Sequence, residues 1–223
     1  MSLSDFAYSI RSRMSFGMAL AESALSGAFK SISPFSRDKL VGNINWGDYN
    51  YPPCVSLVHY DIDDVQHDAL KKVVKLMNRV FLLTVSVCLL NLIDTIVCAP
   101  IYTDAKWEWV MYSGLNIVVF TPFAMYVFFI GYKGLAINDT DLMQRYSLLG
   151  TMQCIFYFIF TIMPFGALNG FLSFAMYKVG IFWGIAIVVE SSMWAIAFGT
   201  ALYTVIFIFR GDYLSLPVAT RVK

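Results

Sequence analysis

Four long uncharged runs occupy the last two-thirds of the chain. They are residues 80–102, broken only by Asp94; residues 109–132; residues 146–177; and residues 179–209, broken only by Glu190. The hydrocarbon core of a bilayer is about 30 Å thick, and a helix needs about 20 apolar residues to cross it. Lipid offers no hydrogen-bond partners, so a crossing backbone must satisfy its own polar groups, which a helix does. The sequence therefore predicts an all-α polytopic membrane protein with four transmembrane helices.

The composition leaves no room for a second globular domain. The 223 residues are 58% hydrophobic and 14% charged, whereas a soluble domain is about 25% charged. We expect a membrane domain over 80–209, with spans at about 80–102, 109–132, 146–168 and 181–209. A cytoplasmic N-terminal segment (1–60, partly flexible) and a basic amphipathic helix (61–79) precede this domain, and a cytoplasmic tail (210–223) follows it.

Basic residues cluster on alternate sides of the four runs. Lys71, Lys72, Lys75 and Arg79 precede the first run, Lys133 and Arg145 lie between the second and third, and Arg210, Arg221 and Lys223 follow the fourth. Positive charge near span ends marks the cytoplasmic side. Both termini and the 133–145 connection are therefore expected in the cytoplasm. The two outer connections, about 103–108 and a turn near Lys178, are expected to be short.

The N-terminal third carries two stretches of helical period. Residues 4–32 place apolar side chains three or four positions apart on a serine-rich background, which fits either a helix lying in the membrane interface or a flexible tail. Residues 61–79 begin with Asp61, Asp63 and Asp64, which suit a helix N-terminus. A basic amphipathic helix that enters a span fits either a surface helix in contact with anionic lipid or a solvated, positively charged flank of the span. The predicted lipid-contact residues are Lys71, Lys72, Lys75, Arg79, Lys133 and Arg145.

Three polar residues interrupt the spans: Asn91, Asp94 and Glu190. An acid near the bilayer centre is costly, so it raises the hypothesis of a functional site. Asp94 lies about 22 Å along a helix from Arg79, and Glu190 about 30 Å from Arg210, which places both toward the outer face. They fit either polar contacts between helices or the acids of a small transporter or channel subunit. Both interpretations stay open at this point.

Other classes of function find no support in the sequence. His59 and His67 lack cysteine or carboxylate partners at metal-ligand spacing, and no nucleotide-binding or hydrolase motif occurs, so we expect no enzyme, metal or cofactor. The net charge of +1 gives no reason to expect nucleic acid. We expect no disulfide framework from the four cysteines. Small-residue steps such as Gly180/Gly184 leave a homo-oligomer open.

A further set of motifs resembles one known family. The chain carries Asn50-Tyr51-Pro52-Pro53-Cys54, His59-Tyr60-Asp61-Ile62, Asn91-Leu92-Ile93, Phe120-Thr121-Pro122 and Tyr132-Lys133. In this order, around four spans, they resemble the secretory carrier-associated membrane proteins over roughly residues 43–213. The resemblance implies a non-catalytic membrane protein of vesicular transport in the trans-Golgi, recycling endosomes, secretory vesicles or plasma membrane. It also implies a scaffold that organises lipids and trafficking proteins.

The chain departs from the family pattern in two places. Residues 126–131 read Tyr-Val-Phe-Phe-Ile-Gly where the family has a Cys-Trp-Tyr-Arg-Pro segment that bears on fusion and phosphoinositide binding. The Asn-Pro-Phe repeats that recruit endocytic adaptors are absent, and Ser33-Pro34-Phe35 is the nearest match. The sequence is thus similar to a divergent member that keeps the membrane core.

Overall fold

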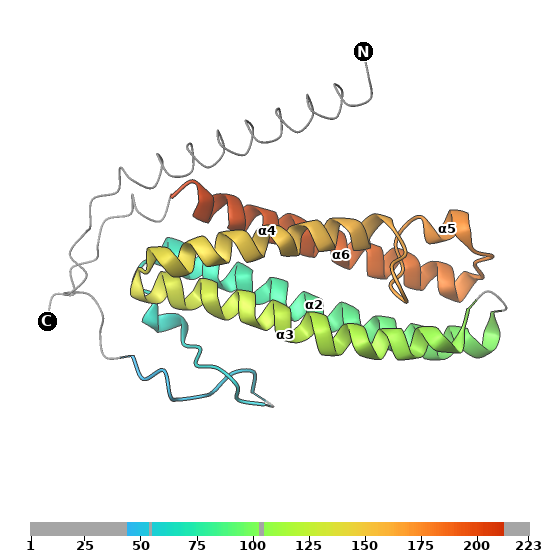
Figure 1. The fold of residues 1–223 in the computed structure, drawn as a ribbon, viewed down its shortest axis with the longest axis horizontal. Helices are drawn as coiled ribbons and strands as arrows, with labels where there is room; N and C mark the ends of the chain where they lie inside the picture. Colours follow the sequence, from blue (N-terminus) through green and yellow to red (C-terminus); the bar gives the residue numbers. More distant parts are fainter. Residues whose placement is uncertain (1–43, 54, 103–104, 212–223) are drawn as a thin grey trace, which may run out of the picture. The chain divides into compact units, whose positions relative to one another are not determined.

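The computed structural model describes residues 44–53, 55–102 and 105–211, and in these residues it consists of helices and connecting segments without a β-sheet (Figure 1). Its long helices are α2 (Asp68–Ile101), α3 (Trp107–Ile137), α4 (Thr140–Ile162) and α6 (Ile181–Phe209), and its short ones are η1 (Ile62–Asp64) and α5 (Ser173–Met176). The expected amphipathic stretch at 4–32 and the tail beyond 211 lie outside the described residues.

The long helices form a four-helix bundle. Helix α2 packs against α3 and α6, and α4 packs against α6 and α3, so each has two neighbours (Figure 1). One end of the bundle brings together residues 68–79, 133–145 and 205–210, and we call it the basic end. The other, formed by residues 96–115 and 163–185, is the opposite end.

Three of these helices are long and apolar enough to cross a membrane, namely α2, α3 and α6. Each presents apolar side chains to the outside as well as to the core. On α2, for example, Leu82, Leu89, Ile93 and Ile96 are exposed while Val80, Val87 and Cys88 are buried. A helix that is apolar on both faces belongs in lipid or deep inside a large protein. The bundle is therefore that of a membrane protein.

The start of α2 differs from the expected helix over 61–79. Asp61 caps the 3₁₀ turn η1 by accepting a hydrogen bond from Asp63 N, and the α-helix begins later, with His67 as its N-cap. From Asp68 the helix then continues to Ile101 without a break. The basic stretch and the first span are thus one rigid element.

The third run is also divided differently. Helix α4 ends at Ile162, before the expected boundary at residue 168. Proline disfavours the helical conformation in the residue before it, and here Pro164 is followed by Gly166, whose φ of +61° is left-handed. The outer connection is consequently not a short turn near Lys178. It is a long segment over 163–180, and we call it the inner loop because its residues 167–170 are buried within the bundle.

Candidate functional site

The segment before α2 folds back on the basic end as a small hairpin, residues 50–58. Tyr51 N and Asn50 N both donate to Val58 O, and Leu57 N and Val58 N donate to Tyr51 O. The Tyr51 ring lies 5.8 Å from that of Phe128 and 6.0 Å from that of Phe81. Its hydroxyl donates to Asn78 Oδ1 at 2.5 Å. The hairpin is therefore fixed against both α2 and α3.

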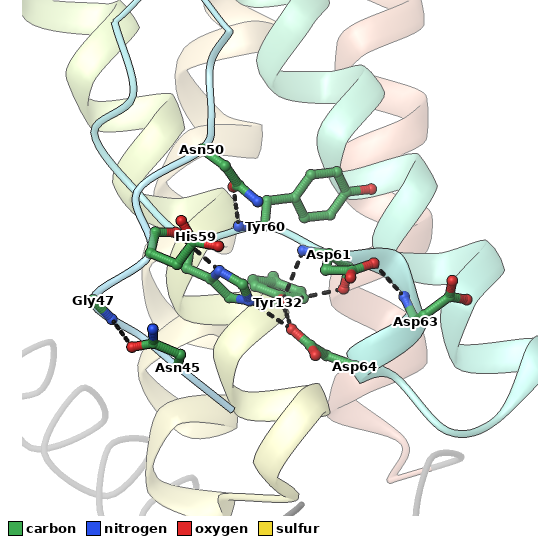
Figure 2. Close-up of polar contacts among 10 residues, drawn as sticks. Asn45, Gly47, Asn50, His59, Tyr60, Asp61, Asp63, Asp64 and Tyr132 are labelled. Carbon is green, nitrogen blue, oxygen red and sulfur yellow. Dashed lines mark hydrogen bonds and ion pairs between the residues drawn. The ribbon is translucent and has the colours of Figure 1, made fainter. Parts of the chain in front are cut away.

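A polar cluster at the base of the hairpin joins it to α3 (Figure 2). His59 Nε2 lies 2.8 Å from Asp64 Oδ2, and His59 Nδ1 lies 3.0 Å from Asp48 O. Tyr132 donates its hydroxyl to Asp64 Oδ2 at 2.5 Å and accepts from Asp61 N at 3.1 Å. Both partners of the imidazole are acceptors, so the protonated ring, with two donors, satisfies them best.

These contacts set the charge of His59. Burial by itself lowers the pKa of the imidazole, but the hydrogen bonds to Asp64 and to the Asp48 carbonyl, with the nearby carboxylate charges, outweigh it and raise the pKa above 6.5. A group whose pKa is higher in the folded state than in the unfolded state stabilises the fold. This stabilisation is complete when the pH is below the pKa of the unfolded state. The contribution is lost as the pH rises through the folded value.

We therefore expect the hairpin to be held more tightly in weak acid than in weak base. Amide hydrogen exchange of residues 50–60, corrected for the intrinsic rate, should show greater protection at pH 6 than at pH 8. The variant His59→Gln, which cannot be protonated, should show the same protection at both values. An equal pH dependence in the variant would contradict the role given to His59.

Trp46 completes this region and meets one of the predicted lipid-contact residues. Its ring packs on those of His59, Phe129 and Tyr132. The ammonium of Lys133 lies 5.0 Å from the centre of the same ring, a cation–π contact. Lys133 is thus partly engaged within the protein.

The remaining predicted lipid-contact residues also lie at the basic end. Lys71 pairs with Asp63 at 2.6 Å. Lys72, Lys75 and Arg79 are exposed along the first turns of α2, and Arg145 is exposed on α4. The structure thus places all six residues at the basic end. Two of them have a partner within the protein, Asp63 for Lys71 and Trp46 for Lys133.

The three intramembrane polar residues fall into one buried network near the opposite end. Asn169, from the inner loop, donates through Nδ2 to Asp94 Oδ2 at 2.7 Å and to Glu190 Oε2 at 2.6 Å. Its Oδ1 accepts from Trp183 Nε1 at 3.0 Å, and its backbone oxygen accepts from Ser191 Oγ at 3.0 Å. One amide therefore joins the inner loop to α2 and α6.

Asn91 lies one helical turn before Asp94 on α2 and extends this network. Its Nδ2 donates to Ala167 O at 2.7 Å, and its Oδ1 accepts from Ser113 at 2.6 Å. Asp94 Oδ1 and Glu190 Oε1 have no hydrogen-bond partner in the described part of the chain. Within the same residues no group of three or more His, Cys, Asp or Glu side chains could hold a metal ion. The arrangement attaches the loop to the helices.

Sequence reasoning found both acids and Asn91 but missed Asn169. It treated Asp94 and Glu190 as single acids on separate spans, whereas the structure brings them to the same amide. A signal for the missing residue was present. Pro164, Gly166 and the pair Asn169-Gly170 are turn-forming residues inside an apolar run, and they indicate a break that carries polar groups into the bundle.

Comparison with known proteins agrees with this architecture. The model of the SCAMP family matches residues 48–211, which contain the hairpin, the polar cluster and every long helix. The chain belongs to the SCAMP family. No curated protein and no solved structure matches it. Family membership makes the chain a membrane-trafficking protein, and the family is a non-enzymatic one.

Proposed function

We propose that the protein is a non-catalytic carrier protein of post-Golgi and endosomal vesicles, which gathers anionic lipids and trafficking partners at its basic end. The observation that carries the proposal is the position of Lys72, Lys75 and Arg79. They are exposed on α2 directly before its uncharged run begins at Val80. Side chains at that level meet lipid headgroups, and each adds up to about 1 kcal/mol of attraction to an anionic leaflet.

The proposal includes a fourth crossing, by α4. Its uncharged part runs from residue 146 to the helix end at Ile162 and is about 25 Å long, at the short end of the lengths that cross the hydrocarbon core. Leu148, Ile155 and Phe158 are exposed on its outer face, as lipid contact requires. Four crossings place the N- and C-terminal sides of the bundle in the same compartment, and the positive charge at the basic end makes that compartment the cytoplasm.

The alternative of a small transporter or channel subunit rests on Asp94 and Glu190. It is not favoured by the family. The hydrogen bonds of both acids to Asn169 also give them a packing role, because they hold the inner loop.

The lipid part of the proposal predicts a loss of anionic-lipid enrichment when the exposed charges are removed. The triple variant K72Q/K75Q/R79Q should lower the affinity by up to about 100-fold, since three contacts of about 1 kcal/mol are lost. The measurement is energy transfer from a label on the reconstituted protein to dilute fluorescent phosphatidylserine in neutral liposomes.

Lys106→Gln provides the matched control. Lys106 is also exposed but precedes α3 at the opposite end, so its neutralisation should leave the enrichment unchanged. The proposed lipid contacts are wrong if the triple variant gathers phosphatidylserine as well as the unaltered protein. Co-localisation of the tagged protein with trans-Golgi and recycling-endosome markers tests the compartment.

A further inference from the structure

We propose that the turn of the hairpin, through the side chains of Val55 and Leu57, inserts into the cytoplasmic leaflet of the bilayer. The protein would then touch lipid not only through its helices and basic residues but also through a non-helical wedge. The inference rests on the bilayer placement in the proposed function and does not need the lysine contacts.

The first argument is depth. Tyr51, at the start of the hairpin, packs on Phe81 and Phe128. Phe81 lies inside the uncharged run of α2, and Phe128 lies about 7.5 Å along α3 from Lys133. Tyr51 therefore lies at the level where the basic residues of α2 end and its uncharged run begins. Figure 1 agrees, because the segment runs alongside α3 and turns away from the end where α2 begins.

The second argument is exposure without charge. Val55 and Leu57 are 60% and 52% exposed, and Pro53 is exposed beside them. Apart from tyrosine and cysteine, residues 49–60 contain one titratable side chain, that of His59. His59 is buried at the base of the hairpin. An apolar tip at the level of the headgroups favours transfer into lipid.

The third argument is the backbone. Amide groups that enter lipid must already be hydrogen-bonded. Val55 N and Ser56 N donate to Pro52 O, and Leu57 N and Val58 N donate to Tyr51 O. Pro52 and Pro53 have no N–H group. Every described N–H of the turn is therefore either satisfied or absent, which lowers the cost of moving the turn into the membrane interface.

The test is the depth of nitroxide labels in the full chain, reconstituted in liposomes. The native Cys88, Cys98 and Cys154 are buried, so only Cys54→Ser is needed before Val55→Cys or Leu57→Cys is introduced. Collision of the label with oxygen, which concentrates in lipid, is compared with collision with a water-soluble nickel complex. Gln144→Cys, exposed on α4 near the basic end, is the water reference, and Ile93→Cys, exposed near the middle of the uncharged run of α2, is the lipid reference.

The labels at Val55 and Leu57 should show an oxygen-to-nickel ratio several-fold above that at Gln144 and below that at Ile93. A ratio equal to that at Gln144 would overturn the inference. So would low collision with both reagents, which would mean that protein covers the turn. If the label at Ile93 also shows the ratio found in water, α2 does not cross the membrane, and the proposed function is refuted together with the inference. If the label at Ile93 shows the ratio of lipid while the labels at the hairpin show that of water, only the insertion is refuted.

Discussion

Replacing Asn169 with alanine should lower the free energy of unfolding by about 3 kcal/mol, because three buried side-chain hydrogen bonds of about 1 kcal/mol each are lost. The amide is the donor shared by Asp94 and Glu190, and it also accepts from Trp183. Without it, the buried carboxyl groups of Asp94 and Glu190 each lose a hydrogen-bond donor, and the indole N–H of Trp183 loses its acceptor. Thermal unfolding in detergent should shift downward by about 10 °C.

Two companion variants make this prediction specific. Asn116→Ala on α3 removes another amide whose Nδ2 has no partner among the described residues, and it should cost little. Adding D94N/E190Q to Asn169→Ala should cost less than the sum of the two changes made separately, because both disrupt the same hydrogen bonds. Unfolding of Asn169→Ala at the temperature of the unaltered protein would refute the anchoring role of the network.

The second large effect is expected from Gly170→Ala. A Cβ at this position would lie 2.5 Å from the backbone carbon of Met163 and 2.6 Å from that of Ile162. Backbone atoms at the end of α4 cannot move aside as a flexible side chain can. The inner loop would shift, which would break the bonds from Phe171 N to Thr161 O and from Leu172 N to Ile162 O and displace the adjacent Asn169. We expect a loss of about 3 kcal/mol or more.

Gly199→Ala is the matched control, because nothing lies within 4 Å of a Cβ at that position on α6. An alanine inside a helix should be neutral or stabilising by about 1 kcal/mol. Gly170→Ala should thus unfold at a lower temperature than the unaltered protein, and Gly199→Ala at the same or a higher temperature. If Gly170→Ala is as stable as Gly199→Ala, the loop does not pack against α4 as described.

The helices were predictable because their signals are local. Uncharged length alone locates α2, α3 and α6, and the charged flanks identify the basic end. The residues at which the helices start and end were harder to predict. Asp61 caps the turn η1 and His67 caps α2, and the bond from Asp61 N to Tyr132, which holds the turn, joins residues far apart in the sequence.

The candidate site could be predicted only in part, for a related reason. Composition singled out Asp94 and Glu190 as acids in lipid, but their meeting on Asn169 depends on how the inner loop returns into the bundle. Likewise, Lys133 was identified by charge alone, while its contact with Trp46 requires the hairpin segment to fold back on α3. Pairings of this kind are tertiary and leave no periodic trace in the sequence.

The crossing of α4 is the central claim, because three crossings would put the two ends of the chain on opposite sides of the membrane and four put them on the same side. Protease treatment of sealed, cytoplasm-side-out vesicles that carry the protein with a tag at each end tests it directly. The account predicts that both tags are digested without detergent. Digestion of one tag and protection of the other would contradict it.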